Sequence, residues 1–154
     1  MTPNPSHRTP TLRAPARFVL LLVAAVALAA LLAGCATTRR VDRNEALREA
    51  QYTWSAAIRW GDFDGAWTMV DPKVREEHPL TALEMERYQQ VQVSAYHELG
   101  ATVGPDTAVR PIEIGVVNRN TQVQREARYV EQWRYDPATK RWWITSGLPD
   151  LWQD

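Results

Sequence analysis

The chain has 154 residues, about the length of one domain, and 45% of them are hydrophobic and 23% charged. This composition excludes a wholly disordered or collagen-like chain. The 18 Lys and Arg residues balance the 18 Asp and Glu residues, which argues against nucleic acid as a partner. The chain has 1 cysteine, so it forms no internal disulfide bond.

The first 34 residues are typical of a secretory signal peptide. Three arginines and no acidic residue precede an unbroken apolar run over residues 18–33, FVLLLVAAVALAALLA, and Gly34 follows the run. The run of about 16 residues is shorter than the roughly 20 that span a bilayer comfortably. A cleaved signal peptide is therefore favoured over a transmembrane anchor.

The segment Leu32-Ala33-Gly34-Cys35 resembles the lipobox of bacterial lipoproteins at all four positions. The resemblance implies cleavage before Cys35, a thioether-linked diacylglycerol on its sulfur, and acylation, by palmitate for example, of the new N-terminus. The lipid bilayer is then the partner of the acylated cysteine. The alternative is a buried cysteine that follows an ordinary signal peptide.

The residue after the cysteine is Ala36 and not Asp. In the sorting pattern of enteric bacteria, this resemblance implies an anchor in the outer membrane that faces the periplasm, with the inner membrane as the alternative. The expected organisation is a cleaved signal peptide over residues 1–34, a lipidated tether over 35–41 and a folded domain over 42–154.

The first part of the domain is predicted to be helical. Asp42 and Glu45 have the spacing of a capping box, apolar residues then recur at helical intervals, and Gly61 ends the pattern. Three shorter helical segments are expected after the following capping residues: Asp62, Asp71 before Pro72, and Thr81 with Glu84. The last of them is expected to end near Arg87.

From residue 91 onward the period changes to two, which predicts strands over residues 91–99, 108–117, 121–135 and 141–146. Residues 100–106 are expected to be a loop. A two-residue turn at Arg119-Asn120 predicts Ile112 opposite Ala127, and places Glu113 opposite Glu126, an unfavourable pair of like charges.

In the last predicted hairpin, Tyr135 pairs with Trp142. Trp133 then faces Ile144, and Trp143 stands beside Arg134 on the other face of the sheet.

Helices followed by an antiparallel sheet predict an α+β domain, with N-terminal helices packed on a curved four-stranded sheet. The segment YTWSAAIRWGDFDGAWTMVDP, residues 52–72, and the order of elements up to Trp143 resemble the nuclear transport factor 2-like, or ketosteroid-isomerase-like, cone fold. This resemblance covers residues 42–152, and a cystatin-like fold is the alternative. The cone-fold family contains enzymes, binding modules and scaffolds, so the fold does not choose among these functions.

No familiar catalytic motif is present, the only cysteine is expected to carry lipid, and the spacing indicates neither a metal nor a cofactor. Glu131 is the first candidate catalytic residue, because an inward carboxylate must be paired or functional. An ion pair with Arg110, its diagonal neighbour in the predicted register, is one expectation. The other resembles ketosteroid isomerase, in which an acid in an apolar cone moves a proton. His97, on the predicted inward face of the first strand, and Tyr129 are the further candidates.

The chain has 7 tryptophans, all after residue 35. The residues expected to line a pocket or fill the core are Trp54, Trp67, Arg110, Tyr129, Glu131 and Trp133. Trp143 is expected to be partly exposed on the outer sheet face and to form an interface with a protein partner or a second copy. The tail over residues 146–154 is the internal competitor for that face.

The favoured function is a non-catalytic ligand- or partner-binding module anchored in the membrane. One alternative is an isomerase or dehydratase-like enzyme, which requires an unpaired Glu131 in a polar cavity. The other alternative is a purely structural envelope lipoprotein.

Overall fold

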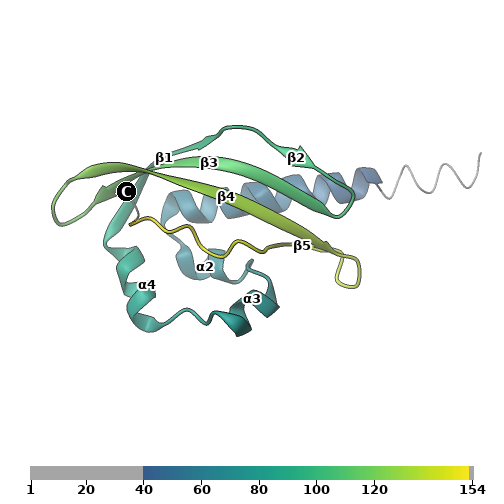
Figure 1. The fold of residues 1–154 in the computed structure, drawn as a ribbon, viewed down its shortest axis with the longest axis horizontal. Coiled ribbons are helices and arrows are strands. Elements are labelled where there is room, and N and C mark those ends of the chain that lie inside the picture. Colours follow the sequence, from purple (N-terminus) through teal and green to yellow (C-terminus); the bar gives the residue numbers. More distant parts are fainter. Residues whose placement is uncertain (1–39, 153–154) are drawn as a thin grey trace, which may run out of the picture. The chain divides into compact units, whose positions relative to one another are not determined.

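A computed structural model describes residues 40–152, so the predicted signal peptide and Cys35 lie outside the described residues. Residues 42–154 cluster as one unit of the chain. Within it, helices precede a curled antiparallel sheet (Figure 1), which confirms the α+β class. No helix among the described residues is both long and apolar enough to cross a bilayer.

A long helix covers residues 40–60 of the described chain and ends as predicted. Gly61 adopts φ +74°, its N–H donates to the Ile58 carbonyl at 3.2 Å, and the Asp62 N–H donates to the Ala57 carbonyl at 2.9 Å. These two bonds form the Schellman motif that ends many helices. The predicted start is wrong, because the helix already includes residue 40 and Asp42 lies inside it.

Three short helices follow, each with the predicted capping residue at its start. They are α2 (Phe63–Trp67), α3 (Pro72–Glu77) and α4 (Ala82–Gln89). The capping box of α4 is complete, since the Thr81 hydroxyl accepts the Glu84 N–H and the Glu84 carboxylate accepts the Thr81 N–H.

The sheet contains β1 (Val91–Glu98), β2 (Thr102–Val103), β3 (Thr107–Asn118), β4 (Gln124–Asp136) and β5 (Arg141–Ile144). Its order is β1-β3-β4-β5, and every neighbouring pair is antiparallel. β2, which lies within the segment 100–106 expected to be a loop, also pairs with β3. At the outer side of β5, Met69 and Asp71 exchange backbone hydrogen bonds with Ile144 at 3.1 and 2.8 Å. The segment after α2 therefore covers this edge of the sheet.

The predicted register of β3 and β4 is wrong by two residues. Ile112 lies opposite Tyr129, and Glu113 lies opposite Arg128, which replaces the expected clash of two glutamates with an opposite-charge pair. A shift of two keeps every side chain on its predicted face, because side chains alternate along a strand.

The shift arises in the turn. Residues 119–123 connect the strands where two residues were expected, and the Asn118 side chain accepts the N–H groups of Asn120 and Thr121 at 2.9 and 3.0 Å. Gln122 closes the turn with φ +60°.

A β-bulge between Val93 and Ala95 reverses the predicted faces at the end of β1. Beyond it Tyr96 is buried and His97 is exposed, so the expectation of an inward His97 is wrong. The bulge meets Gly115 of β3, where an added Cβ would lie 2.8 Å from the Ser94 hydroxyl. The missing side chain at Gly115 leaves room for the bulged strand.

The register of the last hairpin is confirmed: Tyr135 pairs with Trp142 and Trp133 with Ile144. Trp143 lies opposite Arg134 on the other face, but only 9% of it is exposed, so the expectation of an exposed indole is wrong. The Arg141 guanidinium covers its ring at 4.6 Å from the centroid. The neighbouring Arg134 forms an ion pair with Asp71, with Nη2 at 2.6 Å from Oδ2.

The core lies between the long helix and the sheet. Trp54 and Trp133 are fully or almost fully buried there, whereas Trp67 is only partly buried at its margin. The C-terminal tail also joins the core: Leu151 is fully buried, and the Pro149 carbonyl accepts the Tyr88 hydroxyl at 3.0 Å.

We expect Trp54→Ala to lower the free energy of unfolding by about 3–5 kcal/mol, the range for removing a large buried aromatic side chain. Trp54 has 0% exposure and contacts both Tyr129 and Trp133. Urea unfolding followed by circular dichroism measures the change. A loss below about 1 kcal/mol would contradict the packing of this helix on the sheet.

Candidate functional site

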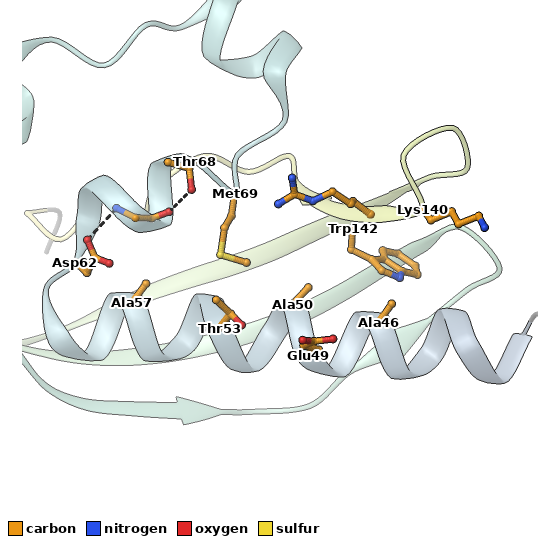
Figure 2. Close-up of a pocket in the computed structure, with 12 residues that line it drawn as sticks. Ala46, Glu49, Ala50, Thr53, Ala57, Asp62, Thr68, Met69, Lys140 and Trp142 are labelled. Atoms are coloured by element: carbon orange, nitrogen blue, oxygen red, sulfur yellow. Dashed lines mark hydrogen bonds between the residues drawn. The ribbon is translucent and has the colours of Figure 1, made fainter.

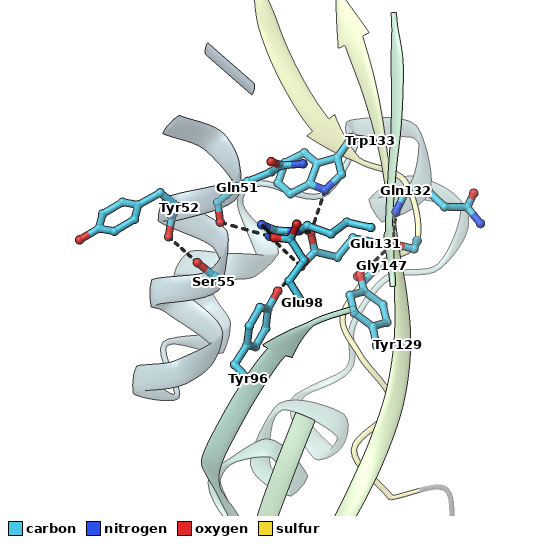
Figure 3. Close-up of polar contacts among 12 residues, drawn as sticks. Gln51, Tyr52, Ser55, Tyr96, Glu98, Tyr129, Glu131, Gln132, Trp133 and Gly147 are labelled. Atoms are coloured by element: carbon cyan, nitrogen blue, oxygen red, sulfur yellow. Dashed lines mark hydrogen bonds and ion pairs between the residues drawn. The ribbon is translucent and has the colours of Figure 1, made fainter. Parts of the chain in front are cut away.

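The Glu131 carboxylate lies in the middle of β4 with 0% exposure and is the most deeply buried charged group among the described residues. Tyr96 and Arg110 donate to Oε1, and Arg110 and Trp133 donate to Oε2. Figure 3 shows the side chains of Tyr96 and Trp133 directed toward Glu131. A buried carboxylate needs such compensation, because its charge is otherwise very costly to remove from water.

Arg110 is the cationic partner of this carboxylate. It lies directly opposite Glu131 in the register, with Nε at 2.8 Å from Oε2 and Nη2 at 3.1 Å from Oε1, a bidentate pair. Its Nη1 also donates to the half-exposed Glu98 at 3.1 Å. Burial alone would lower the pKa of Arg110, but the hydrogen bond and ion pair with Glu131 outweigh burial and raise it.

Tyr96 reaches the carboxylate because of the bulge in β1. Its hydroxyl donates to Glu131 Oε1, and burial, followed by the nearby Glu131 charge, raises the pKa of Tyr96 far above its ordinary value. The hydroxyl is therefore a proton donor in this contact and not a base.

Tyr129 belongs to a neighbouring contact. Its hydroxyl donates to the Gly147 carbonyl at 2.6 Å and lies 2.8 Å from the Ser146 hydroxyl, while its ring stacks on Trp54. Burial raises the pKa of Tyr129 as well. The residue joins the C-terminal tail to the core.

The structure thus brings Arg110, Glu131 and Trp133 together, with Trp54 and Tyr129 beside them. It separates His97, Trp67 and Trp143 from this group. Sequence reasoning missed Tyr96 and Glu98, because strict alternation along β1 places both side chains on the outer face of the sheet. Gly115, which leaves room for the β1 bulge, was the available sign that the alternation is interrupted.

This arrangement leaves the Glu131 carboxylate saturated. A general base must reach a proton on the substrate, and here both carboxylate oxygens already accept hydrogen bonds from the protein. The condition stated for the isomerase-like alternative, an unpaired Glu131 in a polar cavity, is not met.

Open space lies instead on another side of the long helix. A cleft of about 440 Å³ is bounded by that helix, α2 and the start of β5, as Figure 2 shows. Its lining residues are Ala46, Glu49, Ala50, Thr53, Ala57, Asp62, Gly65, Thr68, Met69, Lys140, Arg141 and Trp142. The volume falls within the roughly 300–1,000 Å³ that is usual for small-molecule sites.

The cleft carries charges of both signs around a wall of small side chains. Asp62 lies at the α2 end and Lys140 at the β5 end, with three alanines of the helix between them (Figure 2). Trp142 is fixed in place, since its indole N–H donates to the Arg43 carbonyl at 3.0 Å. No group of three metal-ligating side chains occurs within residues 40–152.

No protein-family model matches the chain, and no curated protein matches it in sequence. Among solved structures, the chain is similar to a SEC-C motif containing protein from Rhodopseudomonas palustris, with a TM-score of 0.50, 16% identity, and coverage of 62% of this chain and 72% of that one. This likeness shows the fold alone: a curled antiparallel sheet with helices.

Two further structures are more distant. One is a SEC-C motif containing protein from Psychrobacter arcticus, with a TM-score of 0.49, 7% identity, and coverage of 70% of this chain and 63% of that one. The other is the association domain of C. elegans CaMKII, with a TM-score of 0.40, 16% identity, and coverage of 70% of this chain and 94% of that one.

Two matched substitutions test the Glu131 contacts. The Trp133 indole N–H donates to Glu131 at 2.9 Å, whereas the equally buried Trp54 indole N–H has no partner in the described chain. We expect Trp133→Phe to cost about 1.5–3 kcal/mol more than Trp54→Phe, because a hydrogen bond to a buried charge is lost only at Trp133. Urea unfolding of both variants measures this difference, and equal losses would show that the indole does not stabilise the carboxylate.

Proposed function

We propose that this chain is a membrane-anchored periplasmic lipoprotein with a cone-fold domain that binds a small ligand without catalysing its conversion. The cleft along the long helix is the observation that carries the proposal. The proposal joins two separate parts, an anchor at Cys35 and a binding site in the domain, and each has its own test.

The anchor is supported by the sequence. The segment Leu32-Ala33-Gly34-Cys35 ends an apolar run, and four residues separate Cys35 from residue 40, the first described residue of the long helix. Four residues reach at most about 14 Å when fully extended, so an acylated Cys35 would keep the domain next to the bilayer. Two or more acyl chains hold a protein firmly, whereas a single chain does not.

The cone fold is supported by a long helix that packs on a curled antiparallel sheet of order β1-β3-β4-β5. In a hollow cone the ligand would bind between helix and sheet. Here Trp54, Trp133 and the Glu131 contacts occupy that space, so the cleft on the side of the helix is the better candidate for a ligand.

The lining of the cleft indicates the chemistry of the ligand. Lys140 complements an anionic group, Glu49 and Asp62 complement a cationic group, and the alanine wall suits methyl groups between them. A short zwitterionic peptide has both charges and the appropriate size. A dimer or partner interface through Trp143 has lost its main support, because this side chain is buried.

We expect Cys35→Ala to abolish lipid attachment and leave an unprocessed precursor, because the thiol is the lipidated group. Metabolic labelling with palmitate, followed by immunoprecipitation, measures attachment. Label retained by the variant would refute the lipoprotein part of the proposal.

The binding part is tested with tri-alanine as the probe, in a titration of the isotope-labelled full chain followed by NMR. We expect shifts confined to residues that line the cleft, including the Trp142 indole N–H. Tri-alanine that is acetylated and amidated lacks both charges and should bind several-fold more weakly.

The two lysines of the chain provide a matched pair. Lys140→Gln removes a charge from the cleft and should weaken tri-alanine binding several-fold, whereas Lys73→Gln, on exposed α3 outside the cleft, should not. Absence of shifts in the cleft at millimolar peptide, or equal effects of the two substitutions, would contradict binding there. A purely structural role would then be favoured.

A further inference from the structure

The long helix exposes two large aromatic side chains, Tyr52 and Trp60, with exposed fractions of 76% and 87%. The other tryptophans among residues 40–152 are buried or half-buried. Tryptophan and tyrosine are enriched among the residues that carry the energy of a binding contact. Tyr52 and Trp60, exposed on one helix, are therefore candidates for contact with another surface.

Both side chains lie on the side of the helix that faces away from the sheet. At about 100° per residue, Tyr52 is roughly 200° around the axis from Trp54, which enters the core. Figure 3 shows Tyr52 pointing away from the Glu131 contacts. Trp60 follows two turns later, and Ala56 lies midway between them around the axis, so the three residues form one outward strip.

The charges beside this strip cancel. Arg48 pairs with Glu45 at 2.9 Å, and the remaining charged neighbours are Glu49 and Arg59, one of each sign. The strip therefore selects no strongly charged partner. Tyrosine and tryptophan combine an apolar ring with a polar group, and they concentrate where lipid acyl chains meet headgroups.

The position of the strip in the chain favours the same occupant. Four residues, at most about 14 Å, separate Cys35 from residue 40, the first described residue of the long helix. The helix from residue 40 to Trp60 is about 30 Å long, so a domain tethered at its start can lay this helix along the bilayer.

We infer that the strip formed by Tyr52, Ala56 and Trp60 lies in the headgroup region of the bilayer that carries the anchor. The inference rests on the proposed lipidation of Cys35 and adds to it a fixed orientation, in which the long helix lies parallel to the membrane. The energy of this membrane contact comes from the aromatic rings and not from net charge, so the contact is insensitive to salt.

The test uses Ala56→Cys in the full chain, which keeps both aromatics. In the mature protein the lipid blocks the Cys35 sulfur, so the new cysteine is the sole free thiol. It is labelled with an environment-sensitive nitrobenzoxadiazole dye, and the protein is reconstituted into phosphatidylethanolamine–phosphatidylglycerol vesicles. Val130→Cys is the matched control, because Val130 is exposed on a β-strand away from the helix.

We expect the emission of the dye at position 56 to shift to the blue. Lipids with nitroxide-labelled headgroups should quench most of this fluorescence, and the quenching should be equal at low and high salt. The dye at position 130 should behave as in water. Adding Tyr52→Ser and Trp60→Ser should abolish the quenching at position 56 while the protein still floats with vesicles.

The outcomes separate this inference from the proposed function. A protein with two reactive thiols that does not float with vesicles refutes the anchor itself. A protein that floats with one reactive thiol, but whose dye at position 56 is unquenched, refutes only the membrane-facing strip. Disulfide-linked dimers through position 56 would assign the strip to a second copy of the chain and would also overturn the inference.

Discussion

The burial of the Glu131 carboxylate is the constraint on which the rest of this domain depends. A carboxylate with 0% exposure is tolerable only when a cation and further donors surround it, and three residues from three strands do so here. Arg110 supplies the charge from the adjacent strand, Trp133 donates from the same strand, and Tyr96 donates from β1. Removing any one donor would leave part of a buried charge without compensation, so the contacts fix the register of β1, β3 and β4 together.

This constraint also bears on where the proposed ligand would bind. Because the indoles of Trp54 and Trp133 and the Glu131 contacts fill the space between helix and sheet, little room is left there for a substrate. The 440 Å³ cleft lies on a different side of the same helix, where alanines leave space and charged residues stand at the ends. The filled interior and the open flank are the two observations behind the proposed binding along the helix.

The long helix serves three surroundings. Leu47, Trp54 and Ile58 enter the core, the alanines line the cleft, and Tyr52 and Trp60 remain exposed beside it. A helix that only covered a sheet would need one apolar side and would be polar elsewhere. In the proposed function, this one element would connect the anchored tether, the packed core and the ligand site.

The sequence by itself determined the local features. Capping residues at Asp62, Asp71 and Thr81, the stop at Gly61 and the period of two after residue 91 depend on neighbours within a few positions, and these predictions were confirmed. The class of the fold and the inward position of Glu131 followed from the same patterns. The lipobox at Cys35 is also a local motif, and it stays a prediction.

Only the tertiary structure decided which residues meet. The bulge in β1 exchanged Tyr96 for His97 on the inner face, and the side chain of Asn118 stabilised a longer turn that moved the register of β3 and β4 by two. The Arg141 guanidinium covers the ring of Trp143, a contact that no alternation pattern contains. The bulge depends on the fit of β1 against β3, strands far apart in the chain, whereas the turn at Asn118 and the cover over Trp143 depend on the path of single side chains. Neither kind of contact leaves a periodic signal in the sequence.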